Sequence, residues 1–235
     1  MTAEDLKQQQ ELITQRIYNH GIEKLHYDWN EIGAIADGVS DIESYLQSSP
    51  KVMWVLKEAY DNNDGGYSMP DDIKTKTNED LADLIKKNRI ATYRNMIYVM
   101  EGLRNPGSYR EDMDDYTKMC YHLRDIAYIN INKMPALNGT KSDQDMSDLF
   151  ESWKEITLEQ IELYSSDIII FGNTLTYFTK QNLLGNLEFL GHSKDGATRV
   201  FKRKNQIIVD AYHPSSFVPN QIDCIIDIIN SILIR

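Results

Sequence analysis

The sequence predicts an α/β protein, a three-layer α/β/α sandwich around a central, mainly parallel four-stranded sheet. Short apolar runs of strand length alternate along the chain with longer segments in which apolar residues recur at helical spacing. One run, DIIIFG at residues 167–172, is apolar at nearly every position, which is typical of a strand covered on both faces by helices. No linker, repeat or low-complexity stretch divides the 235 residues, so we expect a single domain over residues 1–235.

Helices are predicted where apolar residues return every three or four positions. One such segment runs from Asn78, a residue type that favours the N-cap, to Leu103. Pro106 and Gly107 then interrupt the chain. The predicted helical segments are residues 3–19, 78–103, 116–123, 143–164 and 220–233.

Four apolar runs are predicted to form the sheet, because each is bounded by polar or turn-forming residues. Two further β segments, residues 187–193 and 198–204, are expected to make a compact β cluster with the last of these runs. We place the core at residues 50–220 and a helical extension at residues 1–45. The predicted strands of the sheet are residues 51–56, 127–131, 167–172 and 206–212.

Composition and charge argue against several function classes. The net charge of −11 is unfavourable for nonspecific wrapping of nucleic acid, although it leaves room for a small basic footprint. Two cysteines, Cys120 and Cys224, are too few for a four-cysteine metal or iron–sulfur site within one chain. The first twenty residues are unlike a secretory signal, and no apolar run approaches the ~20 residues that span a bilayer. We expect a cytoplasmic monomer without membrane contact.

Ligands of a parallel α/β sheet bind beyond the carboxyl ends of its strands, so those ends are the places to look for chemistry. The first strand is followed by KEAYDNNDGGYSM, residues 57–69, which combines carboxylates, amides, a glycine pair and an aromatic ring. Taken alone, this segment is better described as a flexible acidic surface loop. The chain has no Gly-x-Gly-x-x-Gly and no Gly-Lys-Ser/Thr motif, so a dinucleotide or P-loop phosphate cradle is not supported.

The other three strand ends carry amides, a glycine and a histidine. Asn130 and Asn132 lie in the second strand, where a buried amide is usually satisfied within the protein; the alternative is a base reader, since an amide matches the edge of a pyrimidine. The third strand ends in Gly172-Asn173-Thr174, where glycine permits close approach of a backbone or ligand. The fourth runs into His213-Pro214-Ser215-Ser216, a ring that can donate a proton beside hydroxyls that can hold an anion.

Taken together, the four strand ends resemble the uracil-DNA glycosylase superfamily. Its members carry a first motif of the kind Gly-Gln-Asp-Pro-Tyr or Gly-Glu-Ala-Pro-Gly after the first strand, and residues 57–61 (KEAYD) share Glu-Ala with the second form. Gly66-Tyr67-Ser68 matches the glycine, stacking aromatic and serine that follow. Asn130 matches the asparagine that the next strand offers to a flipped base, and His213-Pro214-Ser215 matches the final motif in order and position. The likeness covers roughly residues 50–220.

Several positions depart from the family pattern. Lys57 stands in place of the leading glycine and Tyr60 in place of the proline. Ala59 occupies the position at which some members have the aspartate that activates water. Asp61 stands where one branch has a tyrosine that guards against a 5-methyl group, which suggests a pocket open beside the pyrimidine C5. The four cysteines of the cluster-bearing branch are missing from the sequence.

The resemblance implies a monofunctional DNA glycosylase, which extrudes a non-standard pyrimidine and hydrolyses its N-glycosidic bond to leave an abasic site. Negative charge grows on a carbonyl oxygen of the departing base, and His213 would be the donor that stabilises it. Glu58 or Asp61 would stabilise the sugar cation and orient water, as in sugar hydrolysis. The expected base-binding residues are Tyr67 as the stacking face, Asn130 as the reader of the base edge, and Ala59 and Asn62 beside them.

The same comparison assigns DNA contacts to the last motif and to a basic patch. Ser215 and Ser216 are suited to phosphates, and Phe217 or Val218 is a candidate wedge into the vacated base stack, with plain packing as the equal alternative for Phe217. Lys202 and Arg203 would add phosphate contacts, although such a basic cluster is also typical of a solvated surface. No metal or cofactor is required.

For the base that is removed, the sequence supports two hypotheses. One is a 5-modified cytosine of phage DNA, hydroxymethylated or glucosylated, which would make the enzyme an antiphage defence; the other is uracil, in base excision repair. Two other classes stay open. A catalytically inactive relative that binds nucleic acid or a partner protein is favoured by Ala59 and the acidic charge, and a hydrolase of free nucleosides or nucleotides would need no basic DNA groove.

Overall fold

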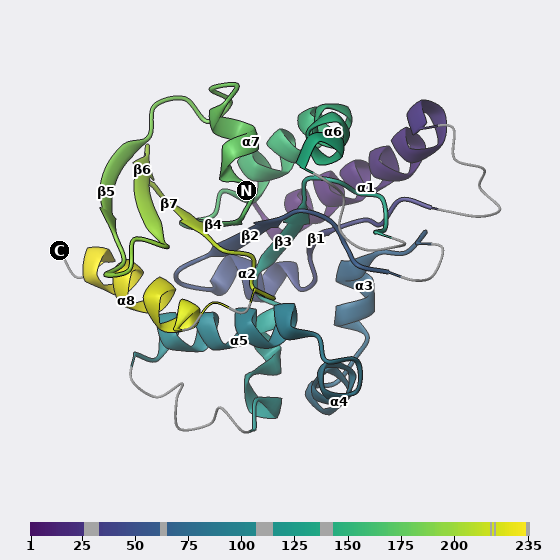
Figure 1. The fold of residues 1–235 in the computed structure, drawn as a ribbon. Helices are drawn as coiled ribbons and strands as arrows, with labels where there is room; N and C mark the ends of the chain where they lie inside the picture. Colours follow the sequence, from purple (N-terminus) through teal and green to yellow (C-terminus); the bar gives the residue numbers. More distant parts are fainter. Residues whose placement is uncertain are drawn as a thin grey trace.

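The computed structural model describes residues 1–25, 33–61, 65–106, 115–136, 143–216, 218 and 220–233. A seven-stranded sheet forms the centre, with helices packed against both of its faces (Figure 1), so the α/β class is confirmed. In chain order the elements are α1 (Ala3–Leu25), β1 (Gly38–Val39), α2 (Ile42–Gln47), β2 (Val52–Leu56), α3 (Met69–Lys74), α4 (Asn78–Asn88), α5 (Ala91–Arg104), the 3-10 helix η1 (Thr117–Leu123), β3 (Ala127–Asn130), α6 (Asp143–Tyr164), β4 (Ile168–Gly172), α7 (Leu175–Thr179), β5 (Glu188–His192), β6 (Arg199–Arg203), β7 (Gln206–Ala211) and α8 (Gln221–Leu233).

The sheet is mixed, and the prediction of four strands is wrong. The strand order is β1-β3-β2-β4-β7-β6-β5. Neighbouring strands pair in parallel from β3 through β2 and β4 to β7, whereas β1, β6 and β5 pair antiparallel with their neighbours. The expected β cluster extends the same sheet, because β6 bonds directly to the free edge of β7. The two residues of β1 fall in the segment expected to be a helical extension, and a strand that short leaves no alternation to recognise.

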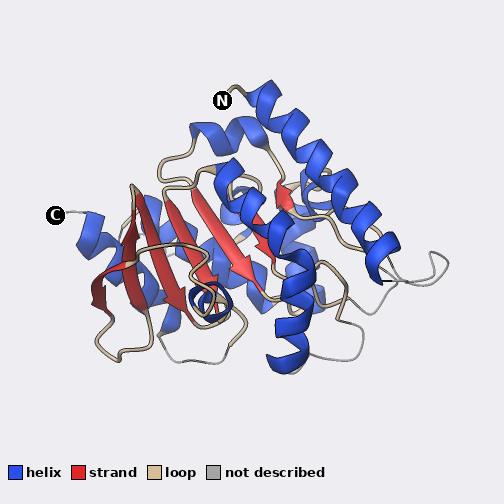
Figure 2. Cartoon of the chain, turned by 90° about the horizontal axis from the view of Figure 1, so that it is seen from above, coloured by secondary structure: helices blue, strands red, loops and turns tan. Residues whose placement is uncertain are grey.

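Alternating strand residues separate the core into two layers. In β2, Trp54 and Leu56 pack with α3, α4, α5, η1 and α8, while Met53 and Val55 pack with α1, α2, α6 and α7. All five residues of β2 are buried, as are those of β4, because helices cover both faces. Figure 1 shows α1, α6 and α7 on one side of the sheet and α3, α4, α5 and α8 on the other, and Figure 2 shows α1 and α6 crossing above the strands.

The connections after β2 and β4 leave toward opposite faces of the sheet. After β2 the chain passes through α3, α4, α5 and η1 before it returns as β3, and after β4 it enters α7 in the other helical layer. Since β2 and β4 are adjacent, their carboxyl ends border a topological switch point. In open α/β sheets this is the usual place for a ligand crevice.

The segment predicted as one helix over residues 78–103 forms two helices. Arg89 takes a left-handed conformation (φ 52°) and ends α4, and α5 begins at Ala91. The N-cap of α4 is Thr77 rather than Asn78, because the Thr77 hydroxyl accepts from the Asp80 amide in a capping box. No glycine or proline marks this break, so the sequence carries no signal for it.

The edge strand β1 is closed by a side chain of α1. The Gln10 amide nitrogen donates to the Val39 carbonyl at 2.9 Å, and its oxygen accepts from the Val39 amide at 2.9 Å. This pairing satisfies backbone groups that an edge strand otherwise leaves open.

Candidate functional site

The carboxyl ends of the four parallel strands meet at one edge of the sheet. Backbone pairing continues past the strands, since the Asn132 amide donates to the Lys57 carbonyl and the Asn173 amide to the Ala211 carbonyl, both at 2.9 Å. The Thr174 hydroxyl donates to the Val55 carbonyl at 2.7 Å and closes the turn after β4. These hydrogen bonds hold the segments that follow the strands, where the predicted motifs lie, at one edge of the sheet.

His213 lies in a tight turn directly after β7. The Ser216 amide donates to the His213 carbonyl at 2.8 Å, and the Ser215 amide donates to Nδ1 of His213 at 3.2 Å. The Ser215 hydroxyl is 2.8 Å from the same nitrogen. Because a backbone N–H can only donate, Nδ1 is the acceptor, and the proton of the neutral ring resides on Nε2.

The ring of His213 is neutral well below pH 7. Burial lowers its pKa to about 4, and the positive charge of Lys57 acts in the same direction. At neutral pH the ring therefore offers a fixed Nε2–H donor, with no protonation step needed to prepare it.

We expect an NMR titration of the His213 ring to show a midpoint near pH 4 instead of the ordinary 6.5. Lys57→Met should raise that midpoint, because the repulsive positive charge is removed. The unfolded chain binds this proton from about pH 6.5 downward and the folded chain only near pH 4, so the free energy of unfolding should fall across that window on acidification. A midpoint at 6.5 or above would contradict the assignment.

Three contacts hold the turn in place. The Asn95 side-chain amide of α5 donates to the Pro214 carbonyl at 2.6 Å. The side-chain amide of Gln221, in the first turn of α8, donates to the Tyr212 carbonyl at 2.7 Å and to the His213 carbonyl at 3.3 Å. From below, the turn rests on Gly172, where a Cβ would lie 3.1 Å from Cδ of Pro214 and 3.3 Å from Cα of His213.

Gly172→Ala should therefore destabilise the protein and displace the His213 turn. The new methyl would also approach Cδ2 of Leu56 to 2.5 Å, and overpacking of this kind costs about 1–3 kcal/mol. Gly191→Ala is the matched control, since its nearest atom, Cδ1 of Ile228, is 3.8 Å away. Urea denaturation and the His213 ring resonances measure both effects; equal stability of the two variants would show that the close contact has no role.

Glu58 is buried directly after β2 and is fixed by Asn132. The Asn132 side-chain nitrogen donates to Oε2 of Glu58 at 3.0 Å, while its oxygen accepts from the Met134 amide at 3.0 Å. Ala59 is also buried, and its carbonyl accepts from the Ala136 amide at 2.9 Å. Asp61 is partly exposed, and Asn62 lies outside the described residues. Of the two candidate carboxylates, Glu58 is the more firmly positioned.

Asn130 is buried in a group of aromatic rings. Its side-chain nitrogen is 3.8 Å from Sδ of Met69, and its Oδ1 has no hydrogen-bond partner within the described part of the chain. The rings of Tyr93 and Tyr128 meet edge to face at 6.1 Å, and burial raises the pKa of both.

Tyr67 is 38% exposed; burial and then the Asp61 and Asp72 charges raise its pKa to about 12. These tyrosines stay protonated at neutral pH.

The Tyr67 loop, residues 65–68, is held by backbone hydrogen bonds with residues 33–36. The Gly66 amide donates to the Gly33 carbonyl at 3.2 Å, and the Ala36 amide donates to the Tyr67 carbonyl at 2.9 Å. Gly65 has φ +64°, and a Cβ there would lie 2.2 Å from the Gly33 oxygen, so no larger residue fits. The glycines that precede Tyr67 thus allow two backbones to touch.

A buried ion pair ties residue 37 to the end of β3. Nζ of Lys133 lies 2.8 Å from both carboxylate oxygens of Asp37, and both side chains are fully buried. Gln160 of α6 donates to Oδ1 of Asp37 at 2.8 Å and accepts from Lys133 at 2.7 Å, and the Asn130 amide donates to Oδ2 of Asp37 at 2.7 Å. Burial lowers the pKa of Lys133, and Asp37 opposes that shift. The network fixes the backbone of Asn130.

The predicted DNA-binding residues are only partly brought together. Ser215 is exposed and Ser216 half-buried beside His213, and Phe217 lies outside the described residues. Lys202 is exposed on β6. Arg203 is buried at the opposite end of the sheet, where its guanidinium donates to Leu184, Gln206 and Glu162. Since those acceptors are protein groups far from the carboxyl edge, the structure gives no support to DNA binding by Arg203.

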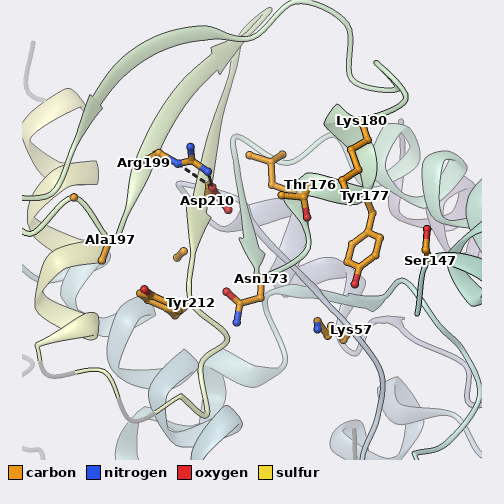
Figure 3. A pocket seen from close by; sticks show the side chains of 13 residues that line it. Lys57, Ser147, Asn173, Thr176, Tyr177, Lys180, Ala197, Arg199, Asp210 and Tyr212 are labelled. Atoms are coloured by element: carbon orange, nitrogen blue, oxygen red, sulfur yellow. Dashed lines mark hydrogen bonds and ion pairs between the residues drawn. The ribbon is translucent and has the colours of Figure 1, made fainter. Parts of the chain in front are cut away.

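A cavity of about 670 Å³ opens at the switch point between the ends of β2 and β4. Figure 3 shows Lys57, Asn173, Tyr177 and Lys180 around it, with the Arg199–Asp210 ion pair on one wall. None of the lining residues is His213, Glu58, Tyr67 or Asn130. The cavity therefore faces the α7 side of the strand ends, whereas Tyr128 and Met69 belong to the α5 side.

Sequence reasoning missed several residues that shape this edge. Asp37 was detectable, because its charge interrupts the apolar stretch AIADGV, whereas Lys133 follows Asn132 in an already polar segment and gave no such signal. Tyr128 shares a strand face with Asn130, two positions away. Asn95 gave no signal, since its role depends on where α5 packs.

Within the described residues no group of three or more His, Cys, Asp or Glu side chains is placed to hold a metal ion. Nor does any described helix combine the length and apolar character needed to cross a membrane. No family model matches the chain, and no curated protein is found to match it.

Proposed function

We propose that the protein is a DNA glycosylase that removes a non-standard pyrimidine. The observation that carries the proposal is the state of His213: a neutral ring, its Nδ1 engaged by a backbone amide, at the carboxyl edge of a parallel sheet. The four parallel strands between two helical layers support the likeness to the uracil-DNA glycosylase superfamily.

In this proposal the flipped base lies between the ends of β3 and β7. Those strands are three inter-strand spacings apart, about 14 Å between backbones, which the side chains of His213 and Asn130 and one flat ring can fill. Tyr67 supplies the stacking face. The Oδ1 atom of Asn130 has no partner within the described part of the chain, so it accepts an N–H from the base edge.

Bond cleavage then proceeds without a metal. As the C1′–N bond breaks, its electron pair passes to the base, and the Nε2–H of His213 donates to the carbonyl oxygen on which the negative charge grows. Glu58, held by Asn132, faces the developing sugar cation and orients the water whose oxygen bonds to C1′. The carboxylate takes one proton from that water and passes it to solvent, the departing base anion takes up a proton from solvent, and a free base and an abasic site remain.

The substrate is proposed to be a 5-modified cytosine, with uracil as the second candidate. Asp61 is partly exposed and close enough to Tyr67 for its charge to raise the pKa of that phenol, so a carboxylate lies in the neighbourhood of the proposed stacking ring. A hydroxyl-rich 5-substituent can hydrogen-bond to a carboxylate, whereas a methyl group cannot. Ser215 and Ser216 would grip the adjoining phosphates.

The decisive experiment is incubation with a panel of oligonucleotides that contain uracil, 5-hydroxymethylcytosine, its glucosylated form, or only standard bases. Alkaline cleavage reveals abasic sites, and mass spectrometry identifies the released base. Release from a modified-cytosine strand alone supports the full proposal, and release of uracil alone removes the modified-base part. Release from free nucleosides but from no strand would replace the glycosylase with a nucleoside hydrolase.

A further inference from the structure

The cavity at the switch point has a lining that the proposed base chemistry does not use. Its walls come from separate segments: the residue after β2, the turn after β4 with α7, the start of α6, the loop before β6, and the end of β7. At about 670 Å³ it is large enough for a mononucleotide-sized ligand.

The charges around the cavity favour an anion. Among the described residues of the lining, Lys57, Lys180 and Arg199 are cationic and Asp210 is the one carboxylate. Asp210 is paired with Arg199 through Nε at 3.1 Å and through Nη2. That pair fixes the guanidinium on the wall, and Lys180 brings a further positive charge to the lining.

Three polar side chains of the lining are exposed to solvent and available to a ligand. Within the described part of the chain, no hydrogen bond or ion pair engages the ammonium of Lys180, the side-chain amide of Asn173 or the phenol of Tyr212. Asn173 takes a left-handed conformation (φ 60°), which asparagine adopts more readily than most residues. In Figure 3 its amide lies at the centre of the cavity, between Lys57 and Tyr212.

We propose that this cavity is a second binding site, for a small phosphate-bearing ligand of nucleotide size. Lys180 and Lys57 contact the phosphate, the Asn173 amide reads a polar edge of the sugar or base, and the 41%-exposed ring of Tyr212 provides a flat apolar face. The site is distinct from the proposed base position, because its residues lie on the α7 side of the strand ends, although the charge of Lys57 also acts on His213.

The test is equilibrium dialysis and calorimetry with the full chain and deoxynucleoside monophosphates. Saturable binding to one site is expected, with uncharged nucleosides binding more weakly. Lys180→Gln and Asn173→Gly should each weaken binding, about tenfold or more for the lysine, because a charge-assisted hydrogen bond is lost. Lys118→Gln, the same change on an exposed residue of η1, should have no effect.

Three other results would contradict the proposal, in whole or in part. Equal affinity for inorganic phosphate and for the nucleotides would overturn the nucleotide assignment, and so would binding that Lys180→Gln leaves unchanged. Lys180-dependent binding of an oligonucleotide, with no binding of free nucleotides, would assign the cavity to a DNA strand instead. His213→Ala should bind the nucleotide normally, so this proposal and the glycosylase proposal can fail separately.

Discussion

Replacing His213 with alanine is expected to lower the rate of base release by about a hundredfold or more, with little change in substrate affinity. In the proposed mechanism the ring donates Nε2–H to an oxygen that becomes negative only as the glycosidic bond breaks. Its loss therefore weakens the transition state more than the bound ground state. Single-turnover kinetics on whichever oligonucleotide of the panel is cleaved separate the chemical step from binding.

His192→Ala provides the matched control, because His192 is an exposed histidine on the edge strand β5. It should leave the rate unchanged. Circular dichroism and thermal denaturation establish that His213→Ala is folded. Full activity in a folded His213→Ala protein would contradict the glycosylase mechanism and favour a protein that only binds nucleic acid or a partner.

Removing one member of the Asp37–Lys133 pair should have the largest effect on stability. Asp37→Asn leaves a fully buried ammonium without its counter-ion, which costs about 3–5 kcal/mol. Lys133→Met should cost a similar amount, because a carboxylate that accepts four hydrogen bonds loses two of them. Urea denaturation measures the change in the free energy of unfolding.

Two comparisons test whether burial is the cause. The double variant Asp37→Leu with Lys133→Met should cost less than either single change, since no unpaired charge remains inside. Glu159→Gln breaks the exposed Arg16–Glu159 pair and should cost about 1 kcal/mol or less. Additive costs in the double variant would show that the pair is not coupled.

Much of the carboxyl edge follows from local sequence signals. The β2 and β4 runs are recognisable because a strand buried on both faces is apolar throughout, and the β7 run because Ile207, Ile208 and Val209 lie between polar residues. The positions of His213, Glu58 and Asn130 at strand ends follow from the same runs. The hydrogen bonds of these side chains do not follow from the runs, because the contact of His213 Nδ1 with Ser215 and the Asn132–Glu58 hydrogen bond depend on side-chain geometry.

Features that depend on distant contacts were beyond the sequence. Asp37 and Lys133 are separated by 96 positions, and only the fold shows that they form a pair. The end of α4 at Arg89 has no local marker, and β1 is too short for periodicity to reveal it. Arg203 belongs to a basic run in the sequence, but strand direction carries it to the end of the sheet away from His213.

The contact between residues 33–36 and the Tyr67 loop bears on how far the chain can be shortened. A fragment trimmed to residues 50–220 would keep every motif of the carboxyl edge, yet it would lack the backbone against which Gly65 and Gly66 rest. In such a fragment the loop that carries Tyr67 would lose its backbone hydrogen bonds to residues 33–36. The smallest working unit therefore extends into the amino-terminal segment, well before the first motif.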